Sequence, residues 1–309
     1  MSSSPIKSVA LVGGTGTTGA FFIDEFKKNG QDFNVTLITR KESEDSTKAK
    51  FADIPHFTIR GVDYDDEADL TTALTGQDAV LSILGLGSIG NQQLALVKAA
   101  DKAGVKYFIP SEFGSDFGVA AGESDIIFKP KEAVRQAIEE SGLKHIYIIT
   151  GLFSDFFVNS YYCWDLENFS VEIPGDGSQK SAFTSRADIA KFTVAALKRA
   201  DEFADKTVRI AGYHLSFNDW VNQIEAAAGK KLTVTYSSIE DIEAKIAADI
   251  KVTGGWHSLG DQLRLIIAKD LGRLDLGGNT LDNDKFPSLN FAPLEEYVHD
   301  IVNKSQLAA

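Results

Sequence analysis

The stretch that decides the fold is residues 6–19, IKSVALVGGTGTTG. It begins with a short apolar run containing β-branched residues, which predicts a buried strand, and it ends in a glycine-rich turn. Residues 20–28, AFFIDEFKK, place apolar side chains on one helical face, and residues 34–39, NVTLIT, are again apolar. The opening of the chain therefore predicts a strand, a glycine turn, a helix and a second strand, which form one βαβ unit.

The same alternation continues beyond this unit. Further strands are predicted at residues 56–60, 79–84, 106–109 and 145–150, and helices at 94–103 and 131–141. Strands that are apolar on both faces and separated by helices are typical of a parallel sheet covered on both sides. We therefore predict an α/β fold with a doubly wound parallel (Rossmann) sheet in residues 1–155. A smaller C-terminal α+β substrate domain is expected in residues 156–309, with residues near 180–212 returning to the first domain.

Composition and charge argue against several classes of protein. The chain has 309 residues, of which 43% are apolar and 24% charged, close to the average of globular proteins. The formal net charge of −13 argues against a nucleic-acid partner, because an acidic surface repels phosphates. The N-terminus has no apolar run long enough for a membrane span. Scattered histidines and a single cysteine, Cys163, suggest no metal site and no intrachain disulfide, which favours the reducing cytoplasm.

The glycine turn has the spacing of a dinucleotide-binding site. Its glycines fit the fingerprint G-x-G-x-x-G and its variant G-x-x-G-x-x-G, directly between a predicted strand and a predicted helix. Such a turn brings the backbone close to a pyrophosphate, and the helix N-terminus offers free N–H groups to the anion. The alternative is a purely structural tight turn. The residues expected to hold the cofactor here are Gly13, Thr15, Gly16, Thr17, Thr18 and Gly19.

The end of the second strand indicates which dinucleotide binds. An NAD site places a carboxylate there to hold the ribose 2′-hydroxyl, but this strand ends in Arg40. A guanidinium can pair with a 2′-phosphate through two hydrogen bonds, so we predict NADPH. Lys41 or Lys48 could add positive charge. The alternative is an ordinary surface arginine, since acidic residues occur within 42–45.

A second motif follows the fifth predicted strand. Residues 109–114, IPSEFG, resemble a hallmark segment of the isoflavone reductase-like enzymes, an NmrA-like branch of the atypical short-chain dehydrogenase/reductases. The likeness extends to the glycine turn, to Lys131-x-x-Val134-Arg135 and to residues 186–190, RADIA. It covers most of the chain, densely to about residue 155. The resemblance implies an NADPH-dependent reductase of small, aromatic or conjugated, phenolic-like substrates.

The resemblance also implies roles for particular residues. Lys131 matches the family's key catalytic lysine, which would contact the nicotinamide ribose and act as proton donor or relay. The alternative without a catalytic role is that Lys129 and Lys131 are solvated lysines at the start of a helix. The classical tyrosine is replaced by Ile127, so the proton source stays open. Further cofactor contacts implied by the family are Asp63, Leu84, Gly85, Ser111, Glu112, Phe113 and Phe153.

Aromatic residues crowd residues 153–164, FSDFFVNSYYCW. With Phe113 they suggest a wall for an aromatic substrate, but packing between the two domains explains them equally well. The residues expected to contact substrate are Phe113, Phe157, Tyr161 and Trp164. A second function stays open, that of a redox sensor that binds a dinucleotide without turnover. The presence of Lys131 favours the enzyme, and the sequence does not indicate an oligomeric state.

Overall fold

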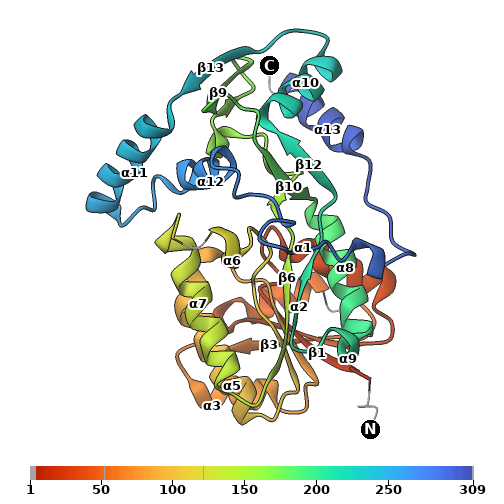
Figure 1. The fold of residues 1–309 in the computed structure, drawn as a ribbon. Helices are drawn as coiled ribbons and strands as arrows, with labels where there is room; N and C mark the ends of the chain where they lie inside the picture. The colour runs from red at the N-terminus through yellow and green to blue at the C-terminus, as the bar shows by residue number, and fades with distance from the viewer. Residues whose placement is uncertain (1–4, 52, 121, 308–309) are drawn as a thin grey trace. The chain divides into compact units, whose positions relative to one another are not determined.

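The computed structural model describes residues 5–51, 53–120 and 122–307 (Figure 1). The chain forms two compact units whose segments alternate along the sequence. Unit 1 comprises Met1–Phe113, Lys129–Ile148 and Ile189–Val208, and unit 2 comprises Gly114–Phe128, Ile149–Asp188 and Arg209–Ala309. The division into domains at residue 155 stays a prediction, and the chain passes between the two units at other points.

Unit 1 is built on a seven-stranded sheet with the order β11-β6-β5-β4-β1-β2-β3. Its strands are β1 (Ser8–Val12), β2 (Asn34–Arg40), β3 (Phe57–Val62), β4 (Ala79–Ser82), β5 (Tyr107–Ile109), β6 (Lys144–Ile149) and β11 (Lys206–Arg209). The pairs from β6 through β3 run parallel, with Val12 of β1 opposite both Ile38 of β2 and Ser82 of β4. The sheet confirms the predicted doubly wound α/β fold.

The strand order reverses beside β1. The chain passes from β1 outward to β2 and β3, and then returns to β4 on the other side of β1. In doubly wound sheets, ligands bind at this switch point, outside the carboxyl ends of the strands. The glycine turn after β1 and residues 84–85 after β4 both lie at this edge of the sheet.

Helices cover both faces of the large sheet. They are α1 (Gly19–Asn29), α2 (Glu44–Phe51), α3 (Glu67–Leu74), α4 (Leu86–Ser88), α5 (Leu94–Lys102), α7 (Asp125–Glu139), α8 (Arg186–Lys198) and α9 (Ala200–Phe203). Apolar side chains from α3, α5 and α7 share one core with β1, β4 and β5. Figure 1 shows α1 and α8 on the opposite side of the sheet. Both faces of the sheet are therefore buried, as its apolar strands require.

Helix α7 begins earlier than the sequence predicts. The expected start at Lys131 is wrong, because the helix begins at Asp125 and contains Pro130. Proline lacks the N–H that would donate to the carbonyl four residues back, so it usually marks the first helical turn. Here the carbonyl oxygen of Ser124 accepts backbone hydrogen bonds from two residues of the first turn, which starts the helix before the proline. Lys131 therefore lies in the middle of α7 and not at its N-terminus.

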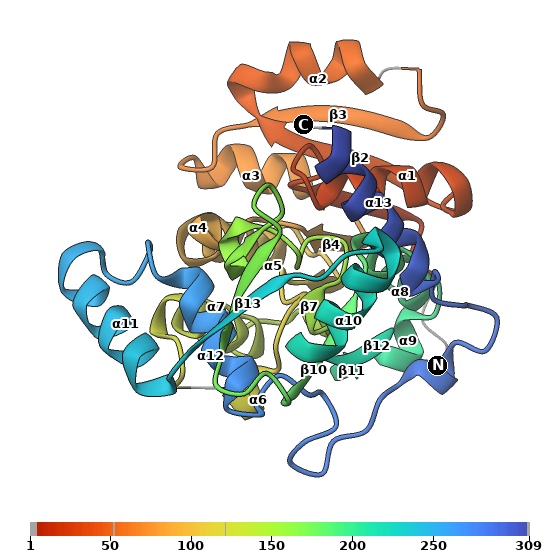
Figure 2. The ribbon, with the colours of Figure 1, turned by 90° about the horizontal axis from the view of Figure 1, so that it is seen from above.

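Unit 2 contains two three-stranded sheets, with the orders β12-β10-β7 and β13-β9-β8. Its strands are β7 (Leu152–Phe153), β8 (Trp164–Asp165), β9 (Ser170–Pro174), β10 (Lys180–Thr184), β12 (Tyr213–Ser216) and β13 (Thr233–Ser237). Its helices are α6 (Phe117–Ala120), α10 (Phe217–Ala228), α11 (Ile239–Thr253), α12 (Leu259–Ala268) and α13 (Leu294–Leu307). Helices α10 and α13 pack side by side and contribute to one apolar core (Figure 2).

Two further findings concern the described part of the chain. No helix there combines the length and the apolarity that crossing a membrane requires. No group of three or more His, Cys, Asp or Glu side chains among these residues is placed to hold a metal ion.

Candidate active site

The turn between β1 and α1 cannot accommodate side chains at two of its glycines. Gly13 has φ +79°, and a Cβ atom there would lie 2.5 Å from the carbonyl oxygen of Ile83. A Cβ at Gly19 would lie 2.2 Å from the carbonyl oxygen of Gly13. The N–H of Gly16 donates to that same carbonyl at 3.0 Å and closes the turn. The spacing of the glycines is therefore a consequence of close backbone packing at the switch point.

The same turn is exposed where it leads into α1. Thr15, Gly16 and Thr17 are exposed, and the side chain of Thr18 makes no capping hydrogen bond. The first turn of a helix carries N–H groups that have no partner within the helix, and its dipole favours an anion. The turn thus has the shape and polarity of a site for a pyrophosphate.

The ends of β4 and β5 are tied together beside this turn. The hydroxyl of Ser111 donates to the carbonyl oxygen of Leu84 at 2.7 Å, and its N–H donates to Oε1 of Gln93 at 2.8 Å. A Cβ atom added at Gly85 would meet no atom within 4 Å. The structure therefore brings the predicted residues Leu84, Gly85 and Ser111 to one edge of the sheet, next to the glycine turn.

A cavity of about 520 Å³ lies at the tips of β2 and β3. It is lined by Arg40, Lys41, Glu42, Val62, Asp63, Tyr64, Asp65 and Gln92. Arg40 and Asp63 are expected here, whereas Tyr64 and Gln92 are not. The pairing of β2 with β3 brings Tyr64 beside Arg40, and Gln92 comes from the helical turn Ile89–Gln93 after β4. Burial raises the pKa of the Tyr64 hydroxyl to about 12, which keeps it neutral. Lys48 is not among the lining residues; it lies on α2 and forms an ion pair with Glu44 at 2.9 Å.

The side chain of Lys131 is buried in the middle of α7. The residue is 7% exposed, which excludes the solvated alternative. Its Nζ donates a short hydrogen bond to the carbonyl oxygen of Glu112, the glutamate of the IPSEFG segment. Oε2 of Glu112 lies 3.9 Å from the same Nζ, and Oε1 accepts a hydrogen bond of 2.7 Å from Nε of Arg135. One amine, one carboxylate and one guanidinium are therefore enclosed together in unit 1.

This environment makes Lys131 a stronger acid than a surface lysine. Burial, the largest influence, lowers its pKa, and the positive charge of Arg135 lowers it further, while the Glu112 carboxylate opposes the shift. An amine with a lowered pKa can give and regain a proton nearer to neutral pH. The site is thus suited to proton transfer.

The predicted aromatic contacts divide into two groups. Phe113 packs its ring 5.5 Å from that of Phe22 in unit 1, and Tyr161 is 39% exposed. Phe157 and Trp164 are each 1% exposed and belong to the core of unit 2. The ring of Phe157 touches those of Tyr162, Trp164, Phe183, Phe217 and Trp220. These contacts of Phe157 and Trp164 are packing contacts within unit 2, and the assignment of both residues to the substrate stays a prediction.

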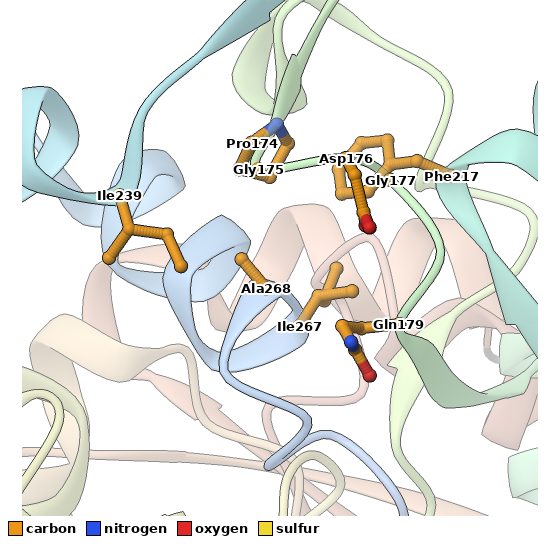
Figure 3. A pocket seen from close by; sticks show the side chains of 9 residues that line it. All are labelled: Pro174, Gly175, Asp176, Gly177, Gln179, Phe217, Ile239, Ile267 and Ala268. Carbon is orange, nitrogen blue, oxygen red and sulfur yellow. The ribbon is translucent and has the colours of Figure 1, made fainter.

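Unit 2 has a cavity of its own, of about 290 Å³, which the sequence did not indicate (Figure 3). It is lined by the turn of residues 174–177 and by Gln179, Phe217, Ile239, Ile267 and Ala268. Figure 3 shows the side chains of Asp176 and Gln179 among apolar neighbours. None of the predicted substrate residues lines this cavity. Phe153, predicted beside the nicotinamide, is a half-buried residue of β7 in unit 2, and its role stays a prediction.

A glycine turn at the switch point of a doubly wound sheet defines a dinucleotide-binding protein. The sequence model of the NmrA-like family matches residues 5–259, and the chain belongs to this family. Phenylcoumaran benzylic ether reductase POP1 of Populus trichocarpa is 28% identical over 314 residues, covering 95% of this chain and 99% of its own. Eugenol synthase 1 of Petunia hybrida is 27% identical over 309 residues, covering 94% and 97%. The expected resemblance is therefore confirmed.

Solved structures agree with these relatives. The structure described as AtPrR2 with NADP+ and (+)pinoresinol has a TM-score of 0.82 and 25% identity, covering 97% of this chain and 100% of its own. The binary complex of leucoanthocyanidin reductase and NADPH from Vitis vinifera has a TM-score of 0.81 at 23% identity, covering 96% and 99%. At 23% identity, the similarity to leucoanthocyanidin reductase shows that the two proteins share a fold.

Proposed function

We propose that the chain is an NADPH-dependent reductase that transfers a hydride to a small, aromatic or conjugated, phenolic substrate. The observation that carries the proposal is the buried Lys131, held by Glu112 in the unit that also contains the glycine turn. A buried lysine with a lowered pKa is costly to the fold, so a chemical role is the economical explanation. The relatives support the substrate class, since a phenylcoumaran benzylic ether and pinoresinol are phenolic molecules.

The residues present fit NADPH. Because the backbone packs closely at Gly13 and Gly19, the turn can receive the pyrophosphate against its backbone. Arg40, at the end of β2, provides the cation that a 2′-phosphate requires. Asp63 lines the same cavity as Arg40, where the adenosine end would lie. We also assign Leu84, Gly85, Ser111, Glu112 and Phe113 to the cofactor site, because they follow β4 and β5 at the switch point.

When bound, NADPH supplies the hydride. The contribution of the chain is to orient the cofactor and to manage the proton that balances the reaction. Negative charge that develops on the substrate as the hydride arrives is neutralised by the Nζ of Lys131, which gives up a proton and regains it from water. The Glu112 carbonyl oxygen holds this Nζ in one direction, so the proton lies at a fixed point. Cytoplasmic location is a further part of the proposal and rests on the single cysteine, Cys163.

The test is a substrate screen with NADPH carrying deuterium at either the 4R or the 4S position. The panel consists of phenolic ethers and conjugated phenols and includes (+)-pinoresinol. A reductase transfers label from one of the two diastereomers only, and the product gains one mass unit. Tight NADPH binding without label in any product would contradict the proposal and would favour the redox-sensing regulator.

A further inference from the structure

Lys131 and Arg135 of α7 donate hydrogen bonds to different parts of Glu112. Lys131 and Arg135 are four residues apart and therefore lie on one face of the helix. Lys131 donates to the backbone carbonyl oxygen of Glu112, whereas Arg135 donates from Nε to the carboxylate at 2.7 Å. The carboxylate is consequently drawn toward Arg135, and its second oxygen stops 3.9 Å from the lysine Nζ.

Arg135 is itself held in place from the other side. Its guanidinium carbon lies 4.5 Å from the ring centre of Tyr147 on β6, and that ring stacks on His145 at 4.0 Å with an interplanar angle of 15°. Asp205, before β11, lies 3.6 Å from Nδ1 of His145. The arginine is thus fixed between the glutamate and a stacked pair of rings, in geometry suited to cation–π contact.

The free oxygen of Glu112 has an alternative partner close by. Oε2 is buried and accepts no hydrogen bond from the described residues. The lysine Nζ lies 3.9 Å from it, and a side-chain rotation would bring the two into direct contact. A buried carboxylate and a buried ammonium attract each other strongly, because little water is present to screen their charges. The hydrogen bond from Arg135 to Oε1 opposes this movement.

We propose that Arg135 is a positioning residue for the reaction, which restrains the Glu112 carboxylate and so prevents it from capturing the Nζ of Lys131. The lysine then stays bonded to a carbonyl oxygen, which orients it without holding its proton as a carboxylate would. This proposal rests on the proposed function of Lys131. Its consequence is that the protonation of Lys131 depends on Arg135 through Glu112. The other charged or titratable groups around Arg135 are Glu139 on α7, His145 and Tyr147 on β6, and Asp205.

The first experiment measures the titration of Lys131 directly. The full-length protein is labelled with ¹³C at the lysine Cε, the Lys131 signal is assigned by its loss in Lys131→Met, and its shift is followed against pH without cofactor or substrate. In Arg135→Gln the carboxylate pairs with the lysine, and the pKa of Lys131 rises by about 1 unit or more. In Glu112→Gln no carboxylate remains, and this pKa falls below that of the parent.

The double variant Glu112→Gln/Arg135→Gln decides whether the arginine acts through the glutamate. Because the charge of Arg135 also lowers the pKa of Lys131 directly, the double variant is compared with Glu112→Gln. The proposal predicts that losing Arg135 raises the pKa of Lys131 by more when the Glu112 carboxylate is present than when it is absent. If the rise is equally large in both backgrounds, the arginine acts by its charge alone and the proposal is overturned. Arg135→Lys keeps the charge but loses the planar fork, so it gives a smaller upward shift and serves where Arg135→Gln does not fold. An unchanged Lys131 titration in every folded Arg135 variant also overturns the proposal.

The matched control is Arg209→Gln. Arg209 forms an equally short pair with Asp116, at 2.6 Å, and its partner is similarly buried, but both residues lie in unit 2. The substitution Arg209→Gln removes a comparable ion pair, and the pKa of Lys131 should keep its parent value. Because the readout needs no turnover, it stands even if the substrate screen fails. Where a substrate is found, the limb of the kcat–pH profile that belongs to Lys131 moves upward in Arg135→Gln, and it moves less when Arg135→Gln is added to Glu112→Gln.

Discussion

Replacing Arg40 with alanine removes the guanidinium at the tip of β2. The cavity that Arg40 lines contains two cationic side chains and three carboxylates. The cations are Arg40 and Lys41, and the carboxylates are those of Glu42, Asp63 and Asp65. After the substitution a single cation remains, and the cavity becomes a poor place for a doubly charged phosphate. NADH carries no 2′-phosphate, so its binding does not depend on this cation.

The size of the effect follows from the contact that is lost. A hydrogen bond to a charged group contributes about 1.5–3 kcal/mol, and each 1.4 kcal/mol is a tenfold change in affinity. The Kd for NADPH therefore rises about 10- to 100-fold in Arg40→Ala, while the Kd for NADH changes by less than about twofold. Because Arg40 is exposed, physiological salt screens the interaction and favours the lower part of this range.

The assay is calorimetric titration of NADPH and NADH into the parent and the variant. Lys48→Ala is the matched control, since Lys48 is a nearby lysine that pairs with Glu44 and does not line the cavity. It should leave the Kd for NADPH within about twofold of the parent. Equal affinity of the parent for the two cofactors, or an equal loss for both in Arg40→Ala, would refute the reasoning.

Three further changes probe the fold and the site. Gly13→Ala places an alanine at φ +79° with its Cβ against a carbonyl oxygen, so it should lower the free energy of unfolding, measured in urea, by about 2–4 kcal/mol. The control is Gly85→Ala, whose added Cβ meets no atom within 4 Å and should change this free energy by less than about 1 kcal/mol. Phe157→Ala should lower this free energy by about 3–5 kcal/mol and the exposed Tyr161→Ala by less than about 1 kcal/mol; similar losses for both would contradict the packing assignment. The pKa of Lys131 is below its ordinary value of 10.5, so the folded state binds fewer protons than the unfolded state and stability rises with pH between the folded pKa and 10.5. Lys131→Met should lose this part of the rise, and an unchanged slope in thermal unfolding would count against the lowered pKa.

The features that sequence predicted best are those that the local chain dictates. The glycine turn must follow a strand and open a helix, so its position and role in the fold could be inferred before any contact was known. Arg40 could be placed because it ends the second strand. The identity of its neighbours could not, since Tyr64 and Gln92 reach the same cavity only through the pairing and folding of distant segments.

Other features depend on contacts between distant residues. The aromatic residues 153–164 looked equally suited to a substrate wall and to packing, and the rings of Phe183 and Phe217 around Phe157 explain the packing. The sequence does not predict the start of α7, because Pro130 is a strong local signal for the first helical turn and the helix begins before it. The burial of Lys131 and its contact with Glu112 join α7 to the segment after β5, a relation that no spacing in the sequence expresses.

The central claim is that Lys131 takes part in hydride transfer from NADPH. The most direct measurement compares single-turnover rates of deuterium transfer from stereospecifically labelled NADPH in the parent, Lys131→Met and Lys129→Met. Lys129 is the matched control, because it is an exposed lysine two positions away on the same helix. The account predicts a rate lower by about 10²–10⁴-fold in Lys131→Met and a parent-like rate in Lys129→Met. A parent-like rate in Lys131→Met, with NADPH bound, would contradict it.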